Sequence, residues 1–451
     1  AVLSAATCEA VRPASALVPR PAMSPTSMAR SWAVLRPASW LEPMAARSVL
    51  SSAAMAAVVR LRNWALVGLK GEQIGALGSS QLDGLSAGQL QALGSAQLRA
   101  LSSTQLASLS STDLNALTTA QIQAMGTDQF QALTTAQVSK LTTAQVAAIQ
   151  TADLVALSTA QIRALTTAQT QALTTAQVQA LTLDQIEGME TTDVAALTSD
   201  QLMALTTGQV SAFTSGQLAA ITTLQLPALE TADLVSIAPS LIASLTTAQV
   251  QALTLEQLTA LTTGQVRALT TTQIGALTLD QVALITPTQA AALTSTQVAG
   301  LGTAQIQALS YNALSALSLD VMPGLTTAQV QALSNDQLLF LTTGQLQAME
   351  AADVAALSSD QLQSLSFVQV AALTTAQIAG MTSAQLSKLT AGQMSALTGD
   401  QIAAIELADL DDLTTAQVRA LGTDVASLTT AQVAGLTTAQ VAALTTSQIV
   451  A

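Results

Sequence analysis

The octapeptide LTTAQVQA, residues 325–332, recurs with variations from Leu69 to Ala451. Counted in steps of eight from Leu69, the chain contains 48 units with no linker between them, and one unit, Leu421–Ser427, has seven residues. A periodic array of this length is typical of a solenoid, in which each repeat contacts only its neighbours.

The eight positions of the unit differ in chemistry. Position 1 is Leu in 38 units, and position 6 is nearly always Val, Ile or Leu, with Thr170 and Ala290 as the main exceptions. Position 8 is mostly Ala, Gly or Ser, whereas positions 4 and 7 vary among small, polar and charged residues. We therefore expect positions 1 and 6 to face a core, position 8 to make a close contact, and positions 4 and 7 to face solvent.

Neither a long helix nor a strand fits this period. Eight helical residues advance about 800°, so a stripe of Leu at position 1 would rotate by about 80° per unit and wind around every face. In a strand, positions 1 and 6 have opposite parity and would point to opposite faces.

A short helix that begins again in every octad satisfies each position. Position 2 is usually Thr, Ser or Gly, which are preferred N-caps, and position 5 is Gln in 38 units. This spacing gives a T-x-x-Q capping box, and positions 1 and 6 become the two ends of a hydrophobic staple.

Four prolines bear on this interpretation. Pro239 and Pro287 occupy position 3, the first helical position, where proline is favoured. Pro227 and Pro323 occupy position 7, where we expect them to shorten or distort the helix.

The sequence thus predicts an all-α fold: an α-solenoid of about 48 eight-residue mini-helix repeats over residues 69–451, with an irregular N-terminal segment over residues 1–68. One octad cannot fold alone, because about 4–6 kcal/mol of apolar burial opposes about 12 kcal/mol of ordering. The stability of the array is therefore collective.

Asp replaces Gln at position 5 in four octads that are 40 residues, or five octads, apart. The same replacement occurs again 120 residues later, which is three times that spacing. The sites are Asp113, Asp153, Asp193, Asp233 and Asp353. Two explanations stay open: one recurring contact per superhelical turn, or duplication of a five-octad block. The recurrence favours a compact solenoid with five octads per turn over one with two.

Composition excludes several classes of chemistry. The chain has no His and a single Cys, Cys8, which removes His-based triads, the common zinc geometries, intrachain disulfides and CxxC redox chemistry. Charged residues make up only 9%. The residues predict no enzyme, no catalytic residue, no cofactor and no resident metal.

The charge is uneven along the chain. Residues 1–70 hold eight basic and two acidic residues, a net charge of +6, whereas residues 71–451 carry −19. A net charge of −13 argues against a nucleic-acid partner, because phosphate binding needs clustered Lys and Arg.

No window approaches the roughly 18 apolar residues of a membrane span, so no transmembrane segment is expected. The most apolar stretch, Ser48–Val59, has the length of a signal-peptide core, but an Ala-rich helix is the favoured interpretation. It lies in a basic head, residues 1–68, that is rich in Ala, Arg, Ser and Pro and contains all three tryptophans, Trp32, Trp40 and Trp64.

Two acidic clusters are candidates for metal sites. They are Asp184, Glu187, Glu190 and Asp193, and Glu406, Asp409, Asp411 and Asp412. Neither has the spacing of a calcium loop, so a solvated acidic face is favoured. Lys140 and Lys388, the candidates for a Ser-Lys pair, occupy position 8 of ordinary units, and helix capping is the favoured role of the many Ser and Thr residues.

The octads resemble the L-T-T-x-Q-[VI]-x-A octapeptide tracts of large secreted or surface-associated repeat proteins of proteobacteria. The resemblance covers residues 69–451 and implies a structural or adhesive role at the cell surface or outside the cell, without any catalytic residue. We therefore expect a self-assembling filament or surface-layer component; the alternative is an adhesin stalk or binding scaffold that presents positions 4 and 7 to a partner.

The expected partner is a second copy of the chain. The final unit leaves Leu444 and Ile449 in core positions, and Trp32, Trp40 and Trp64 are suited to covering such a layer. A surface that fits a different surface on the next subunit gives rings or open filaments. This predicts head-to-tail assembly through those five residues, weakened by salt.

Overall fold

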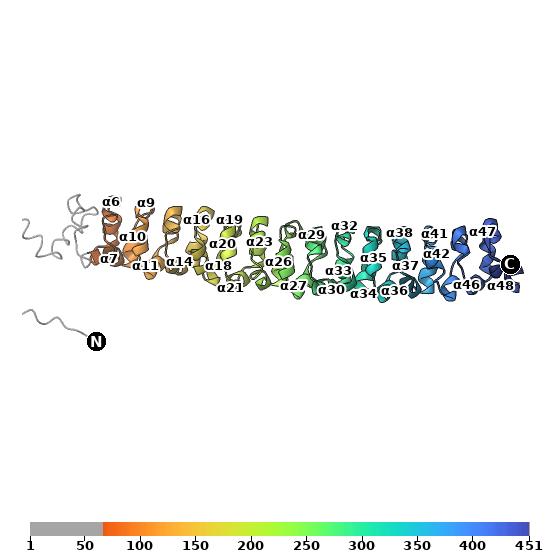
Figure 1. The fold of residues 1–451 in the computed structure, drawn as a ribbon. Helices are drawn as coiled ribbons and strands as arrows, with labels where there is room; N and C mark the ends of the chain where they lie inside the picture. The colour runs from red at the N-terminus through yellow and green to blue at the C-terminus, as the bar shows by residue number, and fades with distance from the viewer. Residues whose placement is uncertain (1–65, 451) are drawn as a thin grey trace, which may run out of the picture. The chain divides into compact units, whose positions relative to one another are not determined.

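A computed structural model describes residues 66–450 as short helices, with no strand in that part of the chain. The chain divides into two compact units, Ala1–Ala132 and Leu133–Ala451. Each octad from residue 69 onward contains one helix, so the predicted all-α solenoid of mini-helices is confirmed. Figure 1 colours the helices in chain order, from red toward the N-terminus to blue toward the C-terminus.

The helices begin at position 3 of the octad and end near its last residue. Those of the first unit are α5 (Gly71–Gly75), α6 (Ser79–Leu82), α7 (Ala87–Gln91), α8 (Ser95–Arg99), α9 (Ser103–Ser108), α10 (Ser111–Ala116), α11 (Thr119–Ala124) and α12 (Thr127–Ala132). The second unit contains the helices from α13 (Thr135–Val138) to α49 (Thr446–Val450), and three 3-10 helices.

Helix α35 (Thr327–Ala332) shows why each octad folds as it does. The Thr326 backbone N–H donates to Gln329 Oε1 at 2.8 Å, and the Gln329 N–H donates to Thr326 Oγ1 at 3.3 Å. These two bonds form the predicted capping box. Leu325 and Val330, the two ends of the staple, are buried.

The prolines behave as their positions predict. Pro239 and Pro287 begin α25 (Pro239–Ile242) and α31 (Pro287–Ala290). The two octads with proline at position 7 form 3-10 helices instead, η1 (Leu226–Ala228) and η2 (Leu319–Gly324). The reason is that proline has no N–H for the bond to the carbonyl four residues earlier.

The seven-residue unit forms the third 3-10 helix, η3 (Gly422–Ser427). Gly422 has φ +59°, a conformation that only glycine adopts at little cost. The missing residue is therefore absorbed locally, by a tighter helix and one left-handed glycine.

Each helix packs on the helix three octads further along, within its own unit. In the first unit α9 packs on α12, and in the second α14 (Thr143–Ala148) packs on α17 (Thr167–Ala172). Position 8 makes the expected close contact: a Cβ added to Gly188 would lie 3.2 Å from the Cβ of Thr159, on the preceding turn.

The spacing of these contacts corrects the prediction of five octads per turn. Successive turns meet at separations of 25 to 31 residues, which is between three and four octads. A recurrence every five octads does not match this spacing, so the Asp residues at position 5 do not mark one contact per turn. The other explanation of the recurrence, duplication of a five-octad block, stays open.

Positions 4 and 7 are mostly exposed, as predicted, and position 3 is exposed as well. No helix within residues 66–450 is long and apolar enough to cross a bilayer. The stretch Ser48–Val59 and the three tryptophans lie outside the described residues.

Candidate functional site

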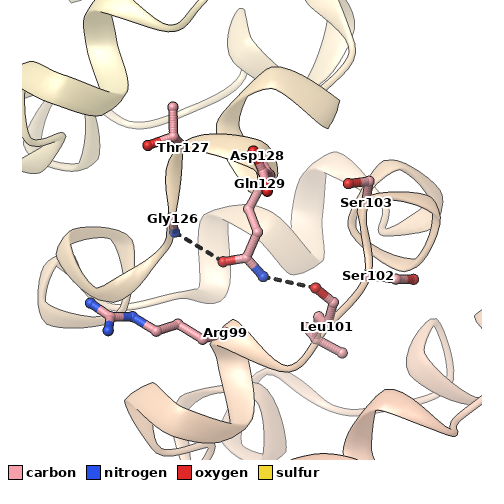
Figure 2. Close-up of a pocket in the computed structure, with 8 residues that line it drawn as sticks. All are labelled: Arg99, Leu101, Ser102, Ser103, Gly126, Thr127, Asp128 and Gln129. Atoms are coloured by element: carbon pink, nitrogen blue, oxygen red, sulfur yellow. Dashed lines mark hydrogen bonds between the residues drawn. The ribbon is translucent and has the colours of Figure 1, made fainter.

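The glutamine at position 5 is the most elaborate polar feature of the fold, and Figure 2 shows one example. Gln129 is buried, and its Oε1 accepts a bond from the Gly126 N–H at 3.1 Å. Its Nε2 donates to the carbonyl oxygens of Leu98 and Leu101, both at 2.9 Å. One side chain therefore caps its own helix and satisfies two carbonyls of the preceding turn.

The same pair of acceptors recurs along both units, and we call this series the glutamine ladder. Before the seven-residue unit, the members donate to the carbonyl 28 residues earlier, and most also donate to the carbonyl 31 residues earlier. Examples are Gln97, Gln121, Gln169, Gln209, Gln257, Gln297, Gln329, Gln377 and Gln417. Sequence reasoning found only the capping half of this role, because the acceptors are backbone groups that no side-chain pattern identifies.

A groove of about 590 Å³ surrounds the bond network of Gln129 (Figure 2). It is lined by Arg99, Leu101, Ser102, Ser103, Gly126, Thr127, Asp128 and Gln129. The Arg99 side chain also donates to the Ala124 carbonyl oxygen at 2.6 Å, through Nε. The groove is lined by one cation, Arg99, and one carboxylate, Asp128.

A second groove, of about 480 Å³, occupies the equivalent place in the second unit. Its lining residues are Gln307, Gln331, Ala332, Leu333, Ser334, Asn335, Ala356, Ser358, Asp360 and Gln361. Both grooves are lined by positions 7, 1, 2 and 3 of two consecutive octads and by positions 2, 4 and 5 of the octad on the next turn. Gln307, Ala332 and Ala356 also line the second groove. The groove is therefore a product of the stacking, and the side chains at positions 3, 4 and 7 determine its chemistry.

The Asp residues at position 5 occupy the place of the ladder glutamines. Asp193 is buried, and this burial, with the charge of Glu190 added, raises its pKa to about 6. Glu190 itself pairs with Arg163, with Nε 3.1 Å from Oε1. Burial also raises the pKa of Asp353; a hydrogen bond from Thr327 Oγ1 at 3.1 Å lowers it, and the charge of Glu350 raises it.

The remaining sequence candidates are not brought together. Within residues 66–450, no three His, Cys, Asp or Glu residues lie close enough to hold a metal ion. The side chains of Lys140 and Lys388 are exposed.

The structure places only two of the five predicted assembly residues. Leu444 is half-buried, and Ile449 is 70% exposed. Val433 and Val441, which occupy position 6 of the two preceding octads, are exposed as well. Trp32, Trp40 and Trp64 lie outside the described residues.

Comparison with known proteins identifies the repeat. A family model described as the ALTTAQ repeat matches segments that together cover more than half of the chain. The matched residues are 74–111, 87–119, 106–143, 146–183, 186–223, 226–263, 255–287, 262–295, 346–383 and 423–451.

No curated protein matches the sequence. Among solved structures, the chain is similar to a homology model of the full-length AP-3 complex in an intermediate open conformation. The identity is 11%, over 92% of this chain and 86% of that chain, with a TM-score of 0.20. A TM-score of this size does not indicate a common fold, and we base nothing on it.

Proposed function

The chain belongs to the ALTTAQ repeat family, and on this premise we propose that it is a structural protein in which the octads of each unit form a rod-like scaffold. The glutamine ladder is the observation that carries the proposal. It ties each turn to the next with buried amide–carbonyl bonds, so that any number of octads continues the same structure.

The finer form of the proposal is head-to-tail self-assembly. Inside each unit, a turn of octads is covered by another turn of octads, through buried residues at positions 1 and 6 and through ladder bonds. A turn on one subunit is therefore complementary to a turn on another. The basic head, residues 1–68 with a net charge of +5, would add attraction to the acidic octads, and salt would weaken it.

Deleting residues 1–68 tests the assembly directly. We expect the full chain to form long filaments in electron micrographs at low salt, and the truncated chain to remain as single rods. If the truncated chain forms the same filaments, the head is not the connector. If the full chain stays monomeric at every salt concentration and protein concentration, the filament proposal is wrong.

Solution scattering tests the rod itself. Residues 133–451 contain between ten and twelve turns at 28 to 31 residues each, and helices stack at about 8–10 Å, so this unit should be on the order of 100 Å long. A fragment restricted to these residues with a compact, near-spherical profile would contradict a scaffold role.

The alternative function is a binding scaffold or adhesin stalk. It is favoured by the exposure of positions 4 and 7, where the sequence varies among small, polar and charged residues. Under this alternative, purified material gives isolated rods that retain a partner, whereas the filament proposal gives fibres.

The proposal also covers the cellular location of the protein, a role without enzymatic activity, and the absence of a nucleic-acid partner. We propose a place at the cell surface or outside the cell, because the octads resemble tracts of secreted repeat proteins, and protease shaving of intact cells tests it. A non-enzymatic role is proposed because the chain lacks His and has one Cys. The acidic composition supports the absence of a nucleic-acid partner, which a filter-binding assay at low salt tests.

A further inference from the structure

The aromatic residues of the described chain fall into two groups. Phe130 and Phe213 are buried in the core. Tyr311, Phe340 and Phe367 are 41%, 49% and 59% exposed, and they lie close to one another in the sequence, within eight consecutive octads. In a chain with 2% aromatic residues, the clustering of the exposed rings calls for an explanation.

Two of these rings form an ordered pair. Tyr311, on α34 (Tyr311–Ala316), stacks on Phe340, on α36 (Asn335–Phe340), with ring centroids 4.7 Å apart and an interplanar angle of 3°. The Tyr311 hydroxyl donates to Asp336 Oδ2 at 3.4 Å. The pair is thus held in one orientation before any ligand arrives.

The second groove begins on the same helix. Asn335, at the start of α36, lines it together with residues of α39 (Ser359–Ser364), the helix that packs on α36. The rings lie where α34 packs on α36, and the groove lies where α36 packs on α39. The rings and the groove therefore share helix α36 and lie at consecutive steps along the second unit.

The groove offers mostly uncharged hydrogen-bonding groups. Gln307 and Gln331 donate to the carbonyls of Ala332 and Ala356 at 2.9 and 3.3 Å, which leaves their Oε1 atoms as acceptors. Ser334, Asn335 and Ser358 add hydroxyls and an amide, and Asp360 adds a carboxylate. The described lining contains no Lys or Arg, so it offers no partner to a phosphate, sulfate or carboxylate ligand.

We propose that this surface, Tyr311, Asp336 and Phe340 with the adjoining groove, binds a neutral oligosaccharide. A pyranose ring has an apolar C–H face, which suits the negative face of an aromatic ring, and an edge of hydroxyls that both donate and accept. Amides and a carboxylate beside the rings meet pairs of such hydroxyls. This combination of one aromatic platform with several convergent polar groups is typical of a specific small-ligand site.

The proposal is independent of filament formation, since it concerns side chains at positions 3, 4, 7 and 8 on one side of the second unit. A cationic peptide is the competing occupant, because two carboxylates and the rings would also suit an ammonium group. We favour the oligosaccharide because uncharged groups outnumber carboxylates in the groove.

The test is titration calorimetry of the full chain with maltohexaose, cellohexaose, mannohexaose and hexa-N-acetylchitohexaose, and with hexalysine and a heparin hexasaccharide. We expect saturable binding of at least one neutral hexasaccharide and none of the heparin fragment. Phe340→Ala and Tyr311→Ala should each lower the affinity about tenfold or more, whereas Phe340→Tyr should retain it.

Leu183→Ala is the matched control, because Leu183 is a similarly exposed side chain at position 3 of another octad. It should leave the affinity unchanged, and circular dichroism should show the same helix content in every variant. Absence of binding to all four neutral sugars, binding of hexalysine alone, or an affinity unaffected by both Ala variants would overturn the proposal.

Discussion

Gln329 Nε2 lies 2.7 Å from the carbonyl oxygen of Leu301, a residue 28 positions earlier in the chain, and 2.8 Å from that of Val298. Both carbonyls belong to the preceding turn, and the glutamine is buried. A buried carbonyl without a donor costs about 1–3 kcal/mol, so each ladder glutamine removes a penalty that would otherwise arise at every turn.

The first prediction removes the ladder donor and keeps the shape of the side chain. Gln329→Met should lower the free energy of unfolding by about 2–4 kcal/mol, because the buried Leu301 carbonyl and the Thr326 N–H lose their partner. The Val298 carbonyl keeps only its bond from the Leu301 N–H. Hydrogen exchange should increase around residues 298–301 and 326–333. Gln171→Met, at the exposed position 7 of α17, is the control and should change little; equal protection of residues 298–301 in the two variants would contradict the ladder.

The second prediction separates the cap from the ladder. Thr326→Ala removes only the N-cap hydroxyl and should cost about 1 kcal/mol, with faster exchange confined to α35. Thr326→Ala combined with Gln329→Ala should also speed the exchange of the backbone N–H groups of residues 298–301, because the preceding turn is no longer tied to α35 by the amide. If the double variant exchanges no faster there than Thr326→Ala, the amide does not link the turns.

The third prediction concerns the one buried side-chain atom among residues 66–450 that has no hydrogen-bond partner, Thr170 Oγ1. Thr170 occupies position 6, where most octads have Val, Ile or Leu. Thr170→Val keeps the shape and removes the unpaired hydroxyl, so it should stabilise the protein by about 1–2 kcal/mol in a urea titration. Thr167→Val, at an exposed position, should have no such effect, and a loss of stability in Thr170→Val would show that the hydroxyl has a partner.

The helices, caps and core could be predicted from the octad because each depends on residues within eight positions. Thr326, Gln329 and the proline positions contain that information in the sequence itself. The turn could not be predicted, because it depends on how α14 packs on α17, and helix packing angles vary with small changes in side-chain contact. For the same reason the second role of Gln329, toward the Leu301 carbonyl, was missed, as was the groove on α36, whose walls come from octads three apart.

The fourth prediction is a pH dependence that arises from Asp193. Its pKa is raised from 3.8 to about 6 by burial and by Glu190, so between these values the folded state binds the proton more tightly than the unfolded state. The contribution of this group to stability is therefore greatest below about pH 4, and it is lost as the pH rises through 6. The total change is at most about 3 kcal/mol.

Substitution identifies the group responsible for the pH dependence. Around Asp193, α17 and α23 (Ser215–Ala220) contribute no ionisable side chain, and the nearby charges are Glu190 and its partner Arg163. Asp193→Gln restores a ladder donor to the carbonyls of Ile162 and Leu165, the two residues at the ladder separations from position 193. It should raise stability at pH 7 and flatten the profile between pH 4 and 7, whereas Asp200→Asn, at an exposed position 4, should leave the profile unchanged. An unaltered profile in Asp193→Gln would assign the titration to another group.

The last prediction concerns register. After the seven-residue unit, the ladder bonds span 27 and 30 residues in place of 28 and 31, as Gln432 donates to the carbonyls of Ile405 and Ile402. One missing residue is thus tolerated, at the cost of converting an α-helix to η3 and placing Gly422 at positive φ. A larger error in register cannot be absorbed in this way, because it moves a side chain of the wrong type to position 5.

Two deletion variants distinguish the effect of shortening the octad array from the effect of shifting its register. Removing the whole octad 325–332 leaves every later residue at its position in the repeat, so the ladder re-forms with the equivalent carbonyls of the preceding turn. Removing residues 325–328 shifts the register by half an octad, and the next three glutamines lose about six bonds, roughly 3–9 kcal/mol in total. Hydrogen exchange should therefore stay slow throughout the first variant and become fast over about four octads on either side of the second deletion. If the two variants exchange alike, apolar burial alone holds the turns together, and the ladder does not set their register.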